Sequence, residues 1–160
     1  MKTPLVGILM GSKSDLEVML EASRILEEFG VPHEMKVLSA HRIPDKTAAY
    51  AAAAEANGIQ VLIAGAGAAA HLAGTVAAHS VLPVIGVPLA ASSLQGFDAL
   101  LSTVQMPGGI PVATMAIGKA GAKNAGLFAV QILARRDAAL SEKMKDYRRS
   151  MREKIEAIEL

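Results

Sequence analysis

The segment "PLVGILMGSKSDLEVMLEASRILEEFG" (residues 4–30) contains the repeating unit from which the fold class can be predicted. Its first part, residues 4–10, is a continuous apolar run that ends at a glycine, which is typical of a strand buried on both faces. Apolar residues then recur at helical spacing, and we predict that Ser14 and Glu17 form a capping box at the start of this helix and that Gly30 ends it. A buried strand that leads directly into a helix favours a parallel sheet.

The same alternation continues along the chain. We predict further strands at 34–38, 59–64, 82–87 and 112–117, and helices at 44–57, 123–136 and 137–158. A loop is predicted at 65–74, followed by a short helix that ends near residue 79, and a mixed loop and helix at 88–109. Such alternation implies right-handed crossovers, with helices on both faces of the sheet. The predicted fold class is α/β, with 1–160 forming one domain.

Composition excludes several kinds of function. The chain has 160 residues with a net charge of +1, so it lacks the electrostatic footprint of a nucleic-acid-binding protein. Three Phe, two Tyr and no Trp leave little for stacking on bases or flavin rings. No apolar run approaches the roughly 18–20 residues of a membrane span. The absence of cysteine excludes disulfides and thiolate chemistry and is compatible with a cytoplasmic location, which we predict.

Four segments rich in Gly, Ser and His follow the predicted strands. They are residues 11–15, 39–42, 65–71 and 88–96. In a parallel sheet, ligands bind at the carboxyl ends of the strands, so these segments are expected to meet at one edge and form a site.

The segment "MGSKSD" (10–15) joins the first strand to the first helix. It is either a turn with a helix cap or an anion site, because free amides at a helix N-terminus favour negative charge. In the second interpretation, Ser12 binds a phosphate or sugar oxygen and Asp15 accepts from ribose hydroxyls. The glycine and lysine positions exclude a dinucleotide-binding fingerprint and a P-loop.

The segment "SAHR" (39–42) follows the second strand. A histidine there is often a packed or surface residue, and a lone arginine is often a solvated charge. Together with Ser39, however, they favour function: Arg42 offers a fork suited to phosphate, and histidine, present here as His41, is the residue type suited to proton transfer.

The segment "AGAGAAAHLAG" (64–74) is a loop of small residues around His71. It serves either close packing or as a lid that closes over a flat ligand. His33 and His79 are interpreted as structural. The four histidines have no cysteine partners and lack paired spacing, so we predict no metal.

Six motifs occur in order along the chain and together resemble one family. They are "GSKSD", "SAHRIP", "AGAGAAAHLAG", "PVIGVPL", "VQMPGGIPVAT" and "AIGKAGAKNAG". The chain resembles the bacterial-type (class I) N5-carboxyaminoimidazole ribonucleotide mutase family over nearly its whole length. The resemblance implies a three-layer α/β/α sandwich with a flavodoxin-like sheet. It also implies a step of de novo purine (IMP) biosynthesis, in which a carboxylate moves from the exocyclic nitrogen of an aminoimidazole to ring carbon C4.

The resemblance also implies roles for individual residues. Ser12, Asp15 and Arg42 would bind the ribonucleotide, with Ser39 beside them. His41 would be the general acid and base. The loop with Gly67, Ala68, His71 and Leu72 would border the base and the migrating carboxylate. No metal, nucleoside triphosphate or organic cofactor is implied.

Two loop residues depart from the family's usual pattern, Gly-Gly-Ala-Ala-His-Leu-Pro-Gly. Ala68 replaces the second glycine and Ala73 replaces the proline. Ala68 is expected to disfavour a positive φ, and without proline the turn is less constrained.

Two rival functions stay open. One is the related carboxylase, which takes free CO2 and the unmodified ribonucleotide; Arg42 and His71 favour the mutase. The other is a flavodoxin-like binding or signalling module, which would want aromatic residues near its loops or acidic residues at its strand ends.

The last helix carries an apolar stripe: Leu140, Met144, Tyr147, Met151, Ile155 and Ile158. We expect residues 137–160 to pack on a neighbouring subunit, because the resemblance implies a homo-octamer. It also implies a functional link to the ATP-dependent synthetase that forms the carbamate.

Overall fold

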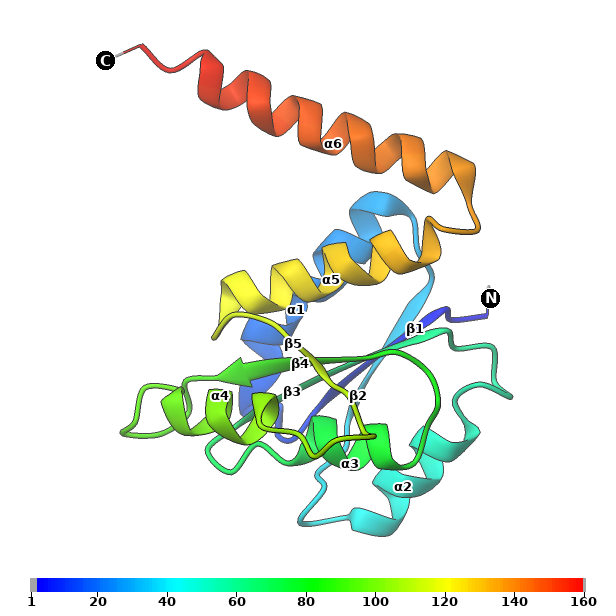
Figure 1. Ribbon diagram of the computed structural model, residues 1–160, viewed down its shortest axis with the longest axis vertical. Helices are drawn as coiled ribbons and strands as arrows, with labels where there is room; N and C mark the ends of the chain where they lie inside the picture. The colour runs from blue at the N-terminus through cyan, green and yellow to red at the C-terminus, as the bar shows by residue number, and fades with distance from the viewer. Residues whose placement is uncertain (1–2, 160) are drawn as a thin grey trace.

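The computed structural model describes residues 3–159 and contains one parallel sheet of five strands (Figure 1). The strand order is β2-β1-β3-β4-β5, in which the first connection runs to one side and the later ones to the other. The strands are β1 (Val6–Met10), β2 (His33–Val37), β3 (Val61–Gly67), β4 (Val84–Leu89) and β5 (Ala113–Thr114). This order places the topological switch point between β1 and β3, where open α/β sheets bind ligands.

Helices cover both faces of the sheet. Helices α1 (Leu16–Phe29) and α5 (Lys119–Leu133) pack together on one face, and α6 (Ala138–Glu156) lies outside them (Figure 1). The other face carries α2 (Pro44–Ala53), α3 (Leu72–Ala78) and α4 (Phe97–Val104). The predicted three-layer α/β/α architecture with a C-terminal helical extension is confirmed.

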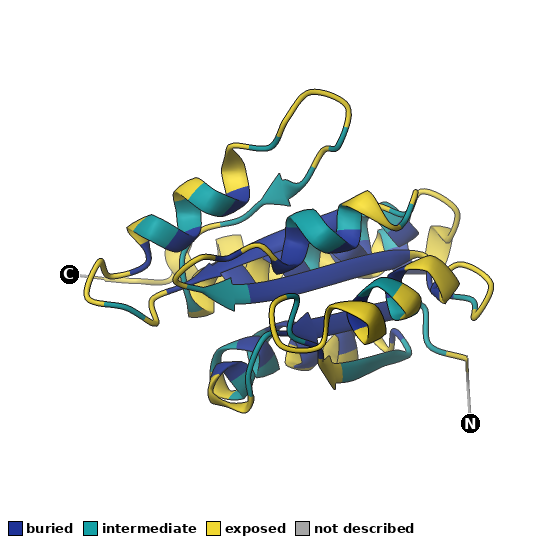
Figure 2. Cartoon of the chain, turned by 90° about the horizontal axis from the view of Figure 1, so that it is seen from below, coloured by how far each residue is buried: buried dark blue, intermediate teal, exposed yellow. Residues whose placement is uncertain are grey.

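The central strands β1, β3 and β4 are apolar because they are largely buried between these layers, whereas the edge strands β2 and β5 are only partly buried (Figure 2). All five residues of β1 are buried, and two adjacent residues of this strand, Ile8 and Leu9, belong to two different hydrophobic clusters. Ile8 faces the layer of α1 and α5, whereas Leu9 faces the layer of α2 and α3. Alternate side chains of one strand thus fill two cores, which is why the run shows no polar alternation.

The predicted cap of the first helix is wrong. Ser14 and Glu17 form no capping box; the box lies two residues earlier, where the Ser12 N–H donates to Asp15 Oδ2 over 2.9 Å and Ser12 Oγ accepts from the Ser14 N–H. A 3-10 turn over Lys13–Asp15 precedes α1 and shifts the box. Glu17 instead accepts from Lys119 Nζ at 2.6 Å. The predicted stop at Gly30 is confirmed, with a φ of 73°.

The edge strand is shorter than predicted. Only Ala113 and Thr114 pair in register with β4. Beyond them the chain makes single bonds, from the Met115 N–H to the Gly86 carbonyl and from the Gly118 N–H to the Pro88 carbonyl. These bonds carry the chain past the end of β4 and into α5, which begins at residue 119 and not at 123.

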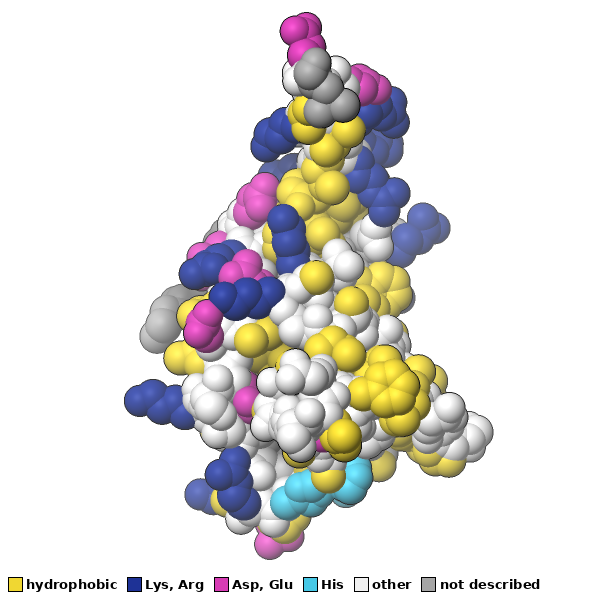
Figure 3. Space-filling view, turned by 90° about the vertical axis from the view of Figure 1, so that its left-hand side faces the viewer, with side chains coloured by type: hydrophobic (Ala, Val, Ile, Leu, Met, Phe, Trp, Pro, Cys, Tyr) yellow, Lys and Arg dark blue, Asp and Glu magenta, His cyan; other side chains and the backbone are white. Residues whose placement is uncertain are grey.

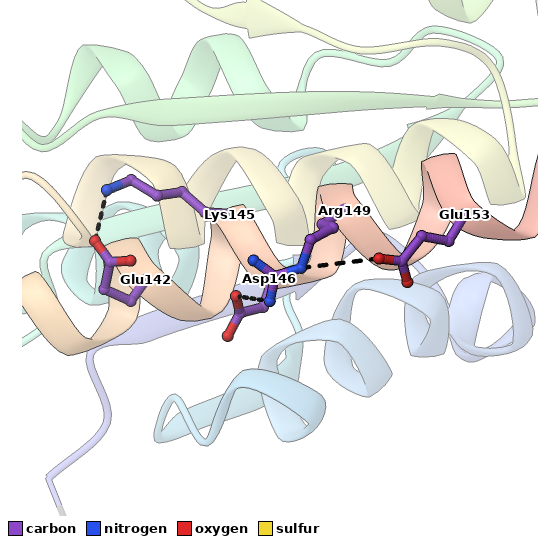
Figure 4. Close-up of polar contacts among 5 residues, drawn as sticks. All are labelled: Glu142, Lys145, Asp146, Arg149 and Glu153. Carbon is purple, nitrogen blue, oxygen red and sulfur yellow. Dashed lines mark hydrogen bonds and ion pairs between the residues drawn. The ribbon is translucent and has the colours of Figure 1, made fainter.

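Helix α6 is half attached to the domain. Asp137 caps its start by accepting from the Leu140 N–H, and Leu140 and Met144 are buried in the core on the α1 side. The Tyr147 ring packs on Phe29, with 5.5 Å between centroids. Ion pairs along the helix are solvated, among them Glu142 with Lys145, Asp146 with Arg149, and Arg149 with Glu153 (Figure 4). The apolar stripe therefore begins as part of this chain's own core.

Within residues 3–159, no helix has both the length and the apolar character needed to cross a membrane.

Candidate functional site

A cavity of about 340 Å³ lies at the carboxyl ends of the strands. All four predicted segments contribute to it, the last through Ala91 alone. Its lining includes all nine residues singled out from the sequence: Ser12, Asp15, Ser39, His41, Arg42, Gly67, Ala68, His71 and Leu72. Side chains from three separate strand–helix connections are thus brought together, as the topology predicts.

The first connection, after β1, presents Ser12 and Asp15 to the cavity. Asp15 is 8% exposed and receives the Ser12 N–H, so its carboxylate is held against the loop backbone. Burial raises the pKa of Asp15, and this effect outweighs the hydrogen bonds from Ser12 and Ser14 and the positive charge of Arg42, which lower it. The fold thus retains at this position a carboxyl group whose charged form is destabilised by burial.

The second connection, after β2, is a tight turn that carries His41 and Arg42. The Ser39 carbonyl closes the turn by accepting from the Ile43 N–H and from the hydroxyl of buried Thr47. Arg42 donates through Nε to Ser39 Oγ over 3.2 Å and through Nη2 to the Gly11 carbonyl. The guanidinium therefore bridges the first and second connections and is fixed in orientation.

His41 and His71 are joined by a hydrogen bond. His41 Nε2 lies 2.8 Å from His71 Nδ1, and the two rings meet edge to face, with centroids 4.9 Å apart. One nitrogen donates and the other accepts, so at least one of the two imidazoles is neutral. Both rings are exposed in this chain, so a ligand in the cavity reaches them directly.

The third connection, after β3, is a strained loop that lies close to the fourth. Ala68 has a φ of 53°, in the left-handed region that favours glycine. At Gly67, a Cβ would lie 2.4 Å from the Cβ of Ala91, so only glycine fits there. The loop thus passes between the cavity and the segment after β4 with no spare space.

Larger hollows elsewhere lack converging polar groups. One of about 640 Å³ lies before β4, and its only histidine, His79, is bonded through Nδ1 to the Thr75 carbonyl. Another, of about 740 Å³, runs along α6 and is lined by solvated charges such as Lys123 and Lys154. Within residues 3–159, no group of three or more His, Asp or Glu side chains is arranged to hold a metal ion.

Comparison with known proteins identifies the family of this chain. A family model described as AIR carboxylase matches residues 5–154. The chain belongs to the AIR carboxylase family. It is 58% identical over 153 residues to the N5-carboxyaminoimidazole ribonucleotide mutase of Pyrococcus horikoshii, covering 96% of this chain and 85% of that protein. The mutase of the same name from Bacillus subtilis is 57% identical, covering 95% of this chain and 94% of that protein.

Solved structures agree with the fold. The crystal structure of Treponema denticola PurE superposes with a TM-score of 0.86 and 31% identity, covering 95% of this chain and 94% of that one. The family resemblance and the flavodoxin-like parallel sheet predicted from the motifs are thereby confirmed.

The two departures from the family's usual loop have different structural consequences. Ala68 has a positive φ, which glycine adopts freely and alanine adopts only with strain. Ala73 is the second residue of α3 and is buried. Its N–H is among those that a helix leaves unpaired, so proline would remove no helical hydrogen bond there.

Sequence reasoning missed four residues at or behind this AIR carboxylase family site. Ser14 and Ala91 line the cavity, Thr47 holds the turn of His41, and Ser102 of α4 bonds the loop before His71. Ser14 was interpreted only as a helix cap. Thr47 and Ser102 gave no signal, because their partners lie 8 and 32 residues away.

Proposed function

We propose that this protein is an N5-carboxyaminoimidazole ribonucleotide mutase of de novo purine biosynthesis. The observation that carries the proposal is the placement of the His41–His71 pair in one cavity with the Arg42 guanidinium and the Asp15 carboxyl. Relatives that carry that name are 53–58% identical to this chain over nearly its whole length. The cavity supplies an anion site, a hydroxyl acceptor and a proton carrier, which are the groups that the reaction requires.

Substrate binding is assigned to the first two connections. Arg42 binds the phosphate, because its guanidinium is already oriented by Ser39 and the Gly11 carbonyl. Asp15 accepts from the ribose hydroxyls, and Ser12 adds a further polar contact. Binding energy at this remote end positions the aminoimidazole against His41.

The chemistry uses His41 as acid and then as base. His41 gives a proton to the carbamate nitrogen as the N–C bond breaks and CO2 leaves, which produces aminoimidazole ribonucleotide. Carbon C4 then attacks the CO2, the new C–C bond forms, and His41 takes the proton that C4 loses. The two transfers cancel, so the enzyme ends in its starting protonation state, and one imidazole suffices.

The loop after β3 retains the CO2. The cavity is lined on this side by Gly67, Ala68, Ala69 and Leu72, which are apolar, and by His71. A pocket that excludes water keeps the CO2 next to C4 and slows its hydration. The bound ribonucleotide provides that exclusion by covering the His41 and His71 rings, which are exposed in the free chain.

Assembly is proposed to be a cytoplasmic homo-octamer with α6 at a subunit contact. The inner half of the predicted stripe is buried in this chain, whereas Met151, Ile155 and Ile158 are 52%, 70% and 61% exposed. Apolar side chains gather along the outer part of the molecule below its C-terminal end, flanked by Lys and Arg (Figure 3). A second copy of the chain would cover them, so the proposed contact of residues 137–160 is confined to the outer half of α6. The carbamate-forming synthetase is proposed as the supplier of substrate.

One assay tests the function. Purified protein is given synthetic N5-carboxyaminoimidazole ribonucleotide, and formation of the C4-carboxylated product is followed. In parallel, aminoimidazole ribonucleotide is supplied with high bicarbonate. We expect fast isomerisation of the carbamate and much slower carboxylation at physiological bicarbonate. Equal or preferred use of free CO2 would make the protein the rival carboxylase.

A further inference from the structure

Ser102 connects α4 to the loop that carries His71. The Ala70 N–H donates to Ser102 Oγ over 3.1 Å, and the Ser102 hydroxyl donates to the Asp98 carbonyl over 2.7 Å. The serine thus accepts from the loop and donates to its own helix, which uses both capacities of one hydroxyl. Ala70 is 2% exposed, so water cannot replace Ser102 as the acceptor of its N–H.

Ser102 contacts this loop at two places, because its Oγ also lies 3.5 Å from the Ala68 carbonyl. Among the described residues, the other backbone hydrogen bonds of 68–71 are local: the His71 N–H donates to the Ala69 carbonyl, and the His71 carbonyl accepts from the Thr75 N–H. Ala68, two residues before the anchored amide, is strained at a φ of 53°. A strained segment stays in place only where its surroundings hold it, and Ser102 is the group that does so here.

The anchored amide belongs to the residue next to His71. A shift of Ala70 therefore moves the His71 imidazole, whose Nδ1 lies 2.8 Å from His41 Nε2. We propose that Ser102 is a positioning residue: through the Ala70 N–H it fixes the loop so that His71 holds the His41 ring in one orientation and one tautomer. This inference rests on the proposed function, in which His41 moves the proton. Ser102 itself lies behind the loop and outside the cavity lining.

The neighbouring residue supplies a matched control. Thr103 also lies on α4, is 2% exposed, and donates its hydroxyl to the Ala99 carbonyl over 2.7 Å. It makes no side-chain bond to the loop. Thr103→Val removes a hydroxyl of the same helix with little change of shape, so it reports the effect of disturbing α4 alone.

The first experiment compares Ser102→Ala, Ser102→Thr and Thr103→Val in the full-length protein. Misplacement of a catalytic group by about 1 Å costs up to roughly 100-fold in rate, so we expect Ser102→Ala to lose roughly 10- to 100-fold in kcat while KM changes little. Ser102→Thr keeps the hydroxyl and should restore most of the rate. Thr103→Val should stay near wild type. A Ser102→Ala enzyme with wild-type kcat, or a Thr103→Val enzyme that loses as much, would overturn the proposal.

The second experiment is a double-mutant cycle with His71→Ala. If Ser102 acts only through His71, then Ser102→Ala lowers kcat in the wild-type background but has almost no further effect once His71 is gone. Equal losses in both backgrounds would show that Ser102 acts by another route. If Ser102→Ala does not fold, Ser102→Cys takes its place, because a thiol is a weak acceptor of the same size class.

The third readout does not depend on turnover. In protein labelled with 15N at histidine, the ring nitrogens of His41 and His71 report which atom carries the proton, with assignments taken from His→Asn variants. We expect the ring-nitrogen signals of wild-type protein to show one defined tautomer for His41 and one for His71. In Ser102→Ala, but not in Thr103→Val, these signals should shift to values averaged over both tautomers. If wild-type protein lacks mutase activity but Ser102→Ala still changes the ring signals in this way, the proposed function is refuted and the positioning role of Ser102 stands. Unchanged ring signals would refute the role.

Discussion

His41 Nε2 and His71 Nδ1 share a hydrogen bond of 2.8 Å, although the two residues are 30 positions apart and lie on different strand–helix connections. The sheet creates this contact, because β1 and β3 are neighbours and β2 lies on the other side of β1. The segments that follow β1, β2 and β3 therefore line one cavity. The pairing means that the proposed proton carrier does not act as an isolated imidazole: one of the two bonded nitrogens must carry a proton and the other must accept it.

His41→Asn should abolish turnover and preserve binding of the ribonucleotide. Asparagine keeps a polar side chain but carries no proton that titrates near neutrality, and loss of general acid–base catalysis costs roughly 10²–10⁴-fold. Steady-state turnover and ligand titration measure the two effects. His79→Asn is the control, because His79 is an exposed histidine bonded only to its own helix. Turnover above about a tenth of wild type would rule out His41 as the proton carrier.

Arg42→Lys should weaken phosphate binding selectively. Lysine cannot bond Ser39 and the Gly11 carbonyl while presenting a planar fork to a phosphate. We expect affinity for the ribonucleotide to fall by about tenfold or more, while affinity for the nucleoside without phosphate changes little. Calorimetric titration of both ligands makes the comparison, with Arg24→Lys on α1 as the control. Equal weakening of both ligands would place Arg42 away from the phosphate.

Ala68→Gly should stabilise the protein. A non-glycine residue in the left-handed region costs about 1–2 kcal/mol, and the extra freedom of glycine in the unfolded chain offsets about 0.5–1 kcal/mol of the gain. The free energy of unfolding should therefore rise by up to about 1.5 kcal/mol, as measured by denaturant titration. Ala69→Gly, at an exposed neighbour without positive φ, should lower it. A loss of stability in Ala68→Gly would mean that the loop is not strained at this residue.

Asp15→Asn should separate stability from binding. The pKa of Asp15 is raised by burial, so the folded protein binds a proton more tightly than the unfolded chain does. The charged carboxyl therefore destabilises the fold at pH values above its folded pKa, and this penalty disappears as the pH falls toward the unfolded value.

Asparagine removes the charge and keeps an acceptor for the Ser12 N–H. At pH 7 we expect the variant to be as stable as wild type or more so, with the difference shrinking toward pH 4, while ribonucleotide affinity falls. Thermal unfolding from pH 4 to 8 and ligand titration test both parts. A stability advantage that grows as the pH falls would contradict the assigned direction of the pKa shift.

Met151→Glu combined with Ile155→Glu should lower the assembly state without unfolding the subunit. Both side chains are more than half exposed, so the subunit core does not depend on them. Charges there would oppose burial against a second copy. Multi-angle light scattering reports the mass and thermal unfolding reports the fold. The control is Arg152→Glu, an exposed position on the same helix outside the stripe. A variant that remains an octamer would show that the outer half of α6 is not a subunit contact.

Local pattern was sufficient for the elements and for the place of the site. The unbroken apolar run of β1, the stop at Gly30 and the proline at the start of α2 each act over a few residues, so they can be read along the chain. Parallel strands end at one edge, so the same pattern also placed Ser12, Arg42 and His71 near one another.

Local pattern failed where two local options compete. Ser12 with Asp15 and Ser14 with Glu17 both have capping-box spacing, and the 3-10 turn selects the first. Glu17 is drawn to Lys119, which lies 102 residues away. The apolar stripe of α6 is continuous in sequence, yet its inner half packs on α1 and only its outer half is exposed, because the domain beneath ends there.

The alternation of strands and helices, the family and the chemical groups at the sheet edge could all be predicted from the amino-acid sequence, because periodicity and motif spacing are properties of neighbouring residues. The pairing of those groups is a result of tertiary packing: His41 bonds His71, Arg42 bonds the Gly11 carbonyl, and the Ala70 N–H bonds Ser102. The physical reason is that a hydrogen bond needs its two atoms within about 3 Å. Chain folding over 30 or more residues sets that distance, and no local pattern encodes it.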